Sequence, residues 1–291
     1  MSRDGAHALT LIAFLGSVFS PYYSWARRRG LPYPLDHCAI NVALAGPRAV
    51  RWSMTERGAR RVVREQTRLA IGRSAWRWTG NELSISIDEV CAPVPRRIRG
   101  TIRLLPSALG DSSFALDPSG RHRWTPYAPC AHAEVCLDEP QMRWSGSAYF
   151  DSNCGEEPLE DAFRAWTWSR ASSPQRGVVL YEVMPRAALD GDADSLALRF
   201  DANGCAEAME PPPRVALPAT RWGIARHTRA DFGCETRVIR TLVSAPFYSR
   251  SLLRTRLAAT ETLAIHESLD LDRFRSPWVQ CLLPFRMPRR A

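Results

Sequence analysis

The chain has 291 residues, which is long enough to bury a large core and favours two domains or one large β domain. Its formal net charge of +9 arises from 39 basic residues, all of them Arg, and 30 acidic residues. These arginines are dispersed, and no basic run alternates with stacking aromatic residues, so the sequence argues against binding of nucleic acid. The positive charge fits attraction to an anionic membrane surface better than binding of nucleic acid.

The apolar segments of the chain do not have the features of a membrane anchor. Residues 8–19 are mostly apolar, but they follow a weakly basic leader and lack a clear small-residue cleavage motif. Arg interrupts every apolar segment before about 18 residues, the length that a spanning helix needs. The sequence therefore predicts a cytoplasmic protein that touches membranes only peripherally.

Alternation with a period of two residues outweighs helical periodicity along most of the chain. Segments of this kind, separated by turn residues, are CAINVAL (38–44), ELSISIDEV (82–90), IRGTIRLL (98–105), VVLYEVM (178–184), SLALRF (195–200) and RVIRTLV (237–243). They predict strands of an all-β barrel or sandwich. Residues 159–168, which follow two acidic residues and Pro158, predict a short helix. Residues 55–71 fit a helix or an exposed strand.

Candidate metal ligands are poorly spaced. The eight cysteines form no C-x-x-C pair, and their pattern predicts reduced, mostly buried thiols rather than a zinc site. His266 and Glu267 precede Asp270 and Asp272, but no second His follows at helical spacing. This acidic group therefore predicts a polar helix start or loop, and no metal site is expected.

Two short motifs bring ionisable and aromatic residues together at strand spacing. They are His122-x-Trp124 and Tyr149-x-Asp151. Since alternate side chains of a strand share a face, His122 and Trp124 point the same way, as do Tyr149 and Asp151. If the two strands meet, a carboxyl group lies among aromatic rings. That arrangement suits an acid that protonates an apolar group while the rings stabilise the resulting cation.

Each of these residues also has a structural interpretation. Taken alone, His122 fits a structural or surface histidine, Trp124 a core side chain and Tyr149 a strand aromatic. Asp151 precedes Ser152-Asn153 and fits a turn whose carboxylate binds its own backbone.

Long aromatic-rich strings carry a resemblance to a known family. GSVFSPYYSWA (16–26), RHRWTPYAPCAHAEV (121–135) and YFDSNCGEEPLEDAFRAWTWSRA (149–171) closely resemble the carotenoid 1,2-hydratases, also called hydroxyneurosporene synthases. The resemblance spans nearly the whole chain. It implies a hydratase of acyclic carotenoids that needs no cofactor, comes from a photosynthetic or carotenoid-making bacterium and associates with the membrane face.

The same resemblance implies a fold and a set of catalytic residues. The fold would be two lipocalin-like β-barrel domains packed together, with a few short helices, and we place the division between residues 1–140 and 141–291. The proton donor of the family corresponds to Asp151, and His122, Trp124 and Tyr149 complete the expected site.

Elementary chemistry agrees with these roles. An alkene is a very weak base, so its proton donor must be a neutral acid, whereas an ordinary Asp is ionised at neutral pH. Burial beside apolar rings raises the pKa of a carboxyl group and would keep Asp151 protonated. The faces of Trp124 and Tyr149 would stabilise the cation, and His122 would orient the attacking water and accept its proton.

Two rival functions fit the same fold class. One is a carrier that binds polyenes without changing them, and the other is a related enzyme that shapes a polyene for cyclisation. The sequence leaves open the preferred carotenoid, hydration at one or both ends, and the oligomeric state.

Overall fold

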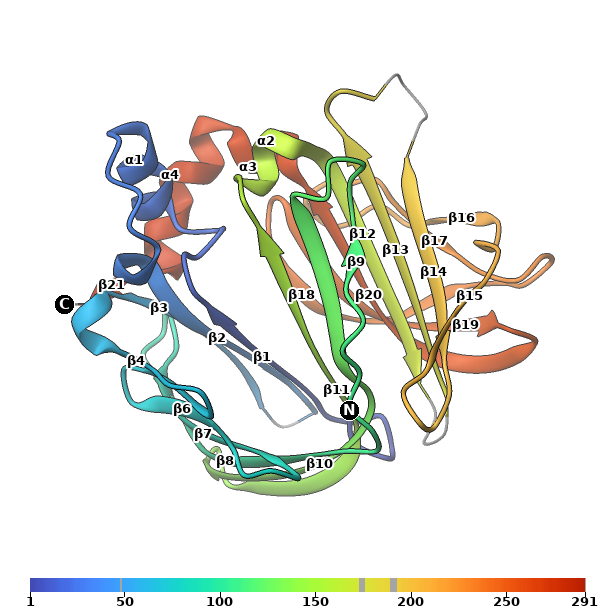
Figure 1. Ribbon diagram of the computed structural model, residues 1–291, viewed down its shortest axis with the longest axis horizontal. Coiled ribbons are helices and arrows are strands. Elements are labelled where there is room, and N and C mark those ends of the chain that lie inside the picture. The colour runs from blue at the N-terminus through green and yellow to red at the C-terminus, as the bar shows by residue number, and fades with distance from the viewer. Residues whose placement is uncertain (48, 173–175, 189–192, 291) are drawn as a thin grey trace. The chain divides into compact units, whose positions relative to one another are not determined.

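Strands form most of the regular structure of the protein, as the computed structural model in Figure 1 shows. The structure describes residues 1–47, 49–172, 176–188 and 193–290. Its helices are short: α1 (Pro21–Arg28), α2 (Leu159–Ala162), α3 (Leu271–Arg275), α4 (Pro277–Arg286) and the 3₁₀ turns η1 (Pro34–His37) and η2 (Ala59–Arg61). Within the described ranges, no helix has both the length and the apolar character needed to span a membrane. The expected all-β class with a few short helices is confirmed.

The chain forms two compact units. Unit 1 contains residues 1–106, 132–148 and 280–291, and unit 2 contains residues 107–131 and 149–279. Both units are therefore assembled from segments that are distant in the sequence. The predicted division after residue 140 concerns domains that fold on their own, which a grouping by contacts does not test, and it stays a prediction.

Unit 1 contains a four-stranded sheet in the order β1-β2-β3-β21 and the ladder β8-β7-β6-β5-β4, which continues from β10. Its strands are β1 (Ala8–Phe14), β2 (Cys38–Ala45), β3 (Val50–Arg57), β4 (Val62–Arg64), β5 (Arg68–Ile71), β6 (Ser74–Trp78), β7 (Leu83–Val90), β8 (Arg97–Pro106) and β21 (Arg289–Arg290). The long strands β10 (His122–Glu139) and β11 (Met142–Gly155) contribute residues to both units.

Unit 2 contains a seven-stranded sheet in the order β15-β14-β13-β12-β20-β19-β18, the short pair β16-β17, and β9 paired with β10. Its strands are β9 (Phe114–Ala115), β12 (Phe163–Ser172), β13 (Gly177–Pro185), β14 (Asp194–Phe200), β15 (Ala206–Ala208), β16 (Arg214–Leu217), β17 (Arg226–Arg229), β18 (Arg237–Ser244), β19 (Tyr248–Leu257) and β20 (Thr260–Asp270).

The seven-stranded sheet buries side chains on both of its faces. Along β13, Val179 and Tyr181 belong to one hydrophobic cluster, whereas Val178 and Leu180 belong to another. This explains why the VVLYEVM segment is apolar at nearly every position instead of alternating with polar residues. The first of these clusters includes Trp124, one of the candidate site residues.

The six segments predicted as strands all lie in strands, namely β2, β7, β8, β13, β14 and β18. The ambiguous stretch 55–71 contains the end of β3, η2, β4 and β5, and no α-helix. The helix predicted over residues 159–168 is wrong beyond Ala162, because Phe163 begins β12. The aromatic-rich segment FRAWTW pairs with β13 on one side and β20 on the other, and this pairing overrides the start signal at Pro158.

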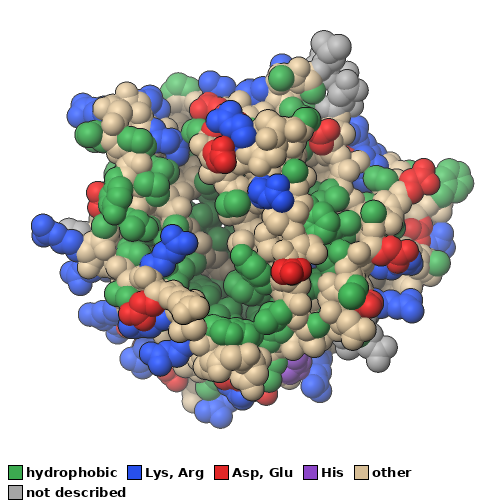
Figure 2. Space-filling model, viewed as in Figure 1, with side chains coloured by type: hydrophobic (Ala, Val, Ile, Leu, Met, Phe, Trp, Pro, Cys, Tyr) green, Lys and Arg blue, Asp and Glu red, His purple; other side chains and the backbone are tan. Residues whose placement is uncertain are grey.

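The surface and the cysteines refine two further predictions. Figure 2 shows the basic side chains scattered over the visible face among apolar and acidic ones, as the sequence indicated. The cysteines are free thiols, but the prediction that most are buried is wrong. Cys38, Cys91 and Cys130 are buried, whereas Cys154, Cys205 and Cys281 are exposed.

Gly100 in β8 provides a test of how tightly unit 1 is packed. Its φ is +152°, and an added Cβ would lie 2.4 Å from the Cys136 carbonyl oxygen and 2.6 Å from the Leu137 Cα. Because both are backbone atoms of β10, Gly100→Ala forces that strand to move. We expect the free energy of unfolding to fall by about 2–3 kcal/mol in denaturant titrations.

Gly120→Ala is the matched control, since its φ is +68° but an added Cβ would meet only the Arg123 guanidinium, at 4.0 Å. We expect it to lose only the backbone strain, about 1 kcal/mol. Equal losses in the two variants would contradict the close approach of β8 and β10.

Candidate functional site

Strands β10 and β11 bring three of the four predicted site residues into direct contact. The indole Nε1 of Trp124 donates a hydrogen bond to Asp151 Oδ2 at 2.8 Å and lies 3.0 Å from the Tyr149 hydroxyl oxygen. The Tyr149 hydroxyl in turn donates to the same Oδ2 at 2.9 Å. Tyr149 and Asp151 meet because alternate residues of β11 share a face. One carboxylate oxygen thus accepts two hydrogen bonds.

The Asp151 carboxyl group is a weaker acid than an ordinary aspartic acid. Its pKa is raised from 3.8 to about 6, because the effect of burial outweighs the hydrogen bonds from Trp124 and Tyr149, which lower the pKa. The residue is half-buried, so part of its surface remains accessible. Burial also raises the pKa of the Tyr149 hydroxyl well above its usual value, which keeps this group a neutral donor at physiological pH.

Further aromatic rings pack against Trp124 and Tyr149, the two donors to this carboxyl group. Trp124 is fully buried, and its ring lies 5.1 Å from Tyr181, 5.6 Å from Phe114 and 6.3 Å from Phe200, measured between ring centroids. Trp168 of β12 lies 5.6 Å from Tyr149 and is half-buried. The face of Trp124 is therefore already covered by protein, while Tyr149 and Trp168 keep accessible surface.

Charged residues of the seven-stranded sheet also act on the site. The Arg170 guanidinium lies 4.7 Å over the ring of Tyr149, and its positive charge lowers the pKa of Asp151. The Glu267 carboxylate raises that pKa. Glu267 is held by Arg250, whose Nε lies 2.8 Å from Oε1. A carboxylate and a guanidinium from distant parts of the chain thus set the charge around Asp151.

A row of paired residues crosses four neighbouring strands and includes Glu267. Arg250 of β19 pairs with Glu267 of β20, Glu267 pairs with Trp168 of β12, and Trp168 pairs with Tyr181 of β13. The Tyr181 hydroxyl donates to Asn153 Oδ1 at 2.9 Å, two residues beyond Asp151. The sequence reasoning did not find this row, since only the strand register aligns its members.

His122 does not join the hydrogen-bonded group. Its buried ring lies 4.8 Å from Phe163, and its Nε2 lies 3.8 Å from the Glu157 carboxylate. A Cβ built on Gly155 would lie 2.6 Å from His122 Nδ1, so the ring packs against the end of β11. Burial lowers the pKa of His122, which favours the neutral imidazole. The structure brings together Trp124, Tyr149 and Asp151, and it places His122 beside the strand that carries Asp151.

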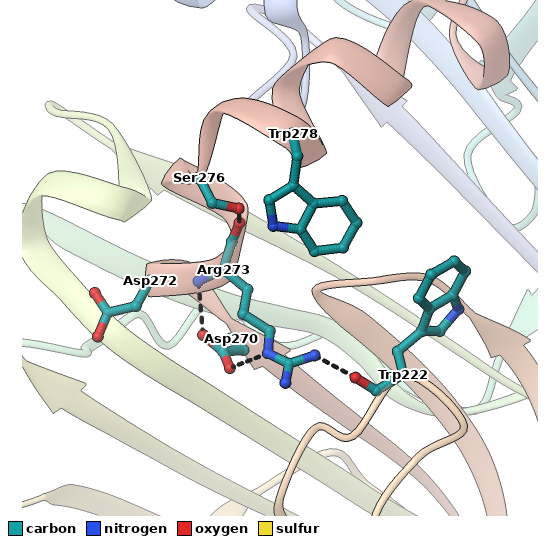
Figure 3. Close-up of a pocket in the computed structure, with 6 residues that line it drawn as sticks. All are labelled: Trp222, Asp270, Asp272, Arg273, Ser276 and Trp278. Atoms are coloured by element: carbon teal, nitrogen blue, oxygen red, sulfur yellow. Dashed lines mark hydrogen bonds and ion pairs between the residues drawn. The ribbon is translucent and has the colours of Figure 1, made fainter.

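A separate pocket of about 600 Å³ lies at the start of α3 and α4 (Figure 3). Its charged groups already have partners, since Asp270 contacts Arg273 at 3.5 Å and caps α3. The predicted polar helix start is confirmed for Asp270 and Asp272, which begin α3, and is wrong for His266 and Glu267, which lie within β20. His266 and Glu267 occupy adjacent positions on β20 and so lie on opposite faces of the sheet. In the part of the chain that the structure describes, no cluster of His, Cys, Asp and Glu could hold a metal ion.

Comparison with solved structures supports the fold. A crystal structure described as that of a candidate AttH protein from Nitrosomonas europaea matches with a TM-score of 0.59, covering 80% of each chain at 13% identity. At this identity the likeness shows the fold alone. The lipocalin-like all-β class expected from the sequence is confirmed.

Sequence comparison gives a closer assignment. The chain is 54% identical to an acyclic carotenoid 1,2-hydratase from Thiocapsa roseopersicina, over 99% of this chain and 71% of the relative. It is 46% identical to that of Rubrivivax gelatinosus, over 100% of this chain and 72% of the relative, and 40% identical to that of Rhodobacter capsulatus, over 97% and 98%. A family model described as carotenoid hydratase CrtC matches residues 11–291. The chain therefore belongs to the carotenoid hydratase CrtC family.

Proposed function

We propose that this protein is an acyclic carotenoid 1,2-hydratase. It adds water across the terminal isopropylidene double bond of substrates such as neurosporene or lycopene and releases a tertiary alcohol. Family membership and the relatives' activity support the reaction. The observation that carries the mechanism is a half-buried carboxyl group with a raised pKa, held between an indole N–H and a phenol O–H.

The proton donor is the Oδ1 atom of Asp151. Oδ2 accepts hydrogen bonds from both Trp124 and Tyr149, so a proton on Oδ2 would compete with these two donors. The proton of the neutral acid is therefore carried by Oδ1. After the proton leaves, the same two hydrogen bonds stabilise the carboxylate without any change of geometry.

The reaction then passes through a tertiary carbocation. Oδ1 gives its proton to the alkene carbon that bears one hydrogen, and positive charge develops on the carbon with two methyl groups. Nearby ring faces contribute about 1–2 kcal/mol each when they are desolvated. We assign this role to Tyr149, which binds Asp151, and to Trp168, whose ring lies 5.6 Å from that of Tyr149. Trp124 acts instead through its N–H, because its ring is covered.

Water completes the addition. Its oxygen bonds to the cationic carbon, and one of its protons returns to the Asp151 carboxylate, which restores the neutral acid. The role expected for His122, accepting that proton before Asp151 does, stays a prediction. Its packing against Gly155 supports a second role, which is to position the end of β11.

Acid–base catalysis accounts for every step of this reaction, and we propose that it needs no metal, nucleotide or redox cofactor. Because the substrate is a long hydrocarbon, we further propose that the protein collects it at the surface of the inner or photosynthetic membrane.

Labelled water tests the function directly. Purified protein is given lycopene or neurosporene in detergent micelles with H₂¹⁸O, and the products are analysed by mass spectrometry. We expect a tertiary alcohol that carries ¹⁸O. Bound but unchanged polyene would instead indicate a carrier, and an unlabelled cyclic product would indicate a cyclising enzyme.

Replacement of the acid should separate activity from stability. Asp151→Asn removes the transferable proton, and we expect the hydration rate to fall by about 10²–10⁴. The folded-state pKa of about 6 lies above the ordinary 3.8. The stabilising contribution of the carboxyl group is therefore complete below pH 3.8 and is lost as the pH rises through 6. Asp151→Asn should thus unfold at a higher temperature than the wild type at pH 8.

Asp111→Asn, in an exposed position of unit 2, serves as the control and should change neither the hydration rate nor the unfolding temperature at pH 8. Hydration by Asp151→Asn within about tenfold of the wild type would eliminate Asp151 as the general acid.

The pH dependence of the rate tests the hydrogen bond from Trp124. Since the reaction needs the neutral acid, the rate should decline as the pH rises above about 6, the pKa of Asp151. Trp124→Phe removes a donor to the carboxylate, which is worth about 1.5 kcal/mol, so this decline should move upward by about one pH unit. Tyr149→Phe should act in the same direction. An unshifted profile in both variants would mean that these donors do not control the acid.

A further inference from the structure

Helix α4 exposes apolar side chains along one face. Trp278 is 48% exposed, Leu282 43% and Phe285 72%, and Cys281 between them is also exposed. Their spacing of i, i+3, i+4 and i+7 aligns them on a single helical stripe. Val279 and Leu283 face the interior and are 1% and 7% exposed. The helix is therefore apolar on two faces, of which only one is covered.

A second exposed tryptophan lies beside Trp278, the first residue of this stripe. Trp222 is 45% exposed, and its ring centroid lies 6.4 Å from that of Trp278. Figure 3 shows the two indoles on neighbouring elements beside the α3–α4 pocket. The Trp222 backbone is held in place, because its carbonyl oxygen accepts a hydrogen bond from Arg273.

The sequence that flanks α4 carries an excess of positive charge. From residue 273 to residue 290 the sequence contains five arginines and no acidic residue. The two aspartates just before α3 are neutralised locally. Asp272 is 2.6 Å from Arg186, and Asp270 is 3.5 Å from Arg273. Arg273 and Arg289 are themselves paired, with Asp270 and Glu56. The excess positive charge at the two ends of α4 therefore comes from Arg275, Arg286 and Arg290, which are exposed.

We propose that the α4 stripe (Trp278, Cys281, Leu282 and Phe285) forms the surface that docks on an anionic lipid bilayer. Tryptophan and phenylalanine insert at the boundary between head groups and acyl chains, while the flanking arginines contact lipid phosphates. The helix lies in the plane of the interface, which suits its length of about 15 Å. This inference rests on the proposed function in one respect: docking would give the enzyme access to a substrate that is dissolved in lipid.

A protein partner fits this surface less well. A single ten-residue helix offers a few hundred Å² at most, whereas stable protein interfaces bury about 800 Å² per partner. A bilayer needs no matching shape, and a few inserted side chains together with basic residues suffice for reversible binding.

Sedimentation with vesicles tests the proposal. The full chain is mixed with vesicles of equimolar phosphatidylcholine and phosphatidylglycerol. We expect the wild type to bind and Phe285→Ser to bind about tenfold more weakly. Leu282→Ser should also weaken binding, and Arg290→Gln should weaken it about fivefold. Pure phosphatidylcholine vesicles should bind the wild type less well. Phe232→Ser is the matched control and should bind as the wild type does, because Phe232 is 88% exposed but its carbonyl oxygen binds Arg256. Arg256 pairs with Glu261 near the start of β20, whereas α3 and α4 follow Asp270 at the end of that strand.

Three outcomes would overturn the proposal: no binding by the wild type, equal binding by Phe285→Ser, or equal losses in Phe285→Ser and Phe232→Ser. A wild-type dimer that Phe285→Ser dissociates in analytical ultracentrifugation would instead assign the stripe to a second copy of the chain. Thermal unfolding confirms that each variant is folded. Hydration measured in detergent micelles should be unchanged in Phe285→Ser, so failure of the docking surface and failure of the proposed hydratase activity give different results.

Discussion

The proposed chemistry depends on a carboxyl group whose neutral form is favoured by burial and which is held at one oxygen by two donors. Burial alone would raise the pKa of Asp151 further and make it a poorer proton donor, whereas the two hydrogen-bond donors alone would leave it ionised. Together they place its pKa at about 6, where a proton is present and can still be given up. An alkene offers no lone pair, so the enzyme can favour the transition state only through this balance and through the surroundings of the cation.

The sequence predicts local parts of this arrangement well. Tyr149 and Asp151 share a face because they are two positions apart on one strand, and Trp124 meets them because adjacent strands bring their alternating faces together. Arg170 and Glu267 could not be found in this way. They reach the site through the pairing of β12 with β20, which joins residues about a hundred positions apart, and nothing in either segment specifies that register.

His122 shows the limit of the same local reasoning. Side chains two residues apart on a strand share a face, but their Cα atoms are separated by about 7 Å. Sharing a face with Trp124 therefore does not place the imidazole near the carboxyl group that Trp124 contacts. The neighbours of His122 are Phe163 and Gly155, which belong to segments that only the folded chain brings beside it. A similar limit explains the helix wrongly extended through FRAWTW, where strand pairing on both sides outweighs a local start signal.

The seven-stranded sheet carries residues of the proposed site on one face and a buried polar network on the other. On the face opposite Trp168, His266 binds Ser169 at 2.6 Å and Ser268 at 2.9 Å, and burial lowers its pKa to about 3. Glu182 contacts His227 and Arg229, and despite the opposing effect of burial these partners lower its pKa to about 2. His266 thus stays neutral and Glu182 stays charged throughout the range in which Asp151 exchanges its proton. Because these supporting groups keep fixed charges near pH 6, a change of protonation at Asp151 does not disturb the sheet that holds the aromatic residues in place.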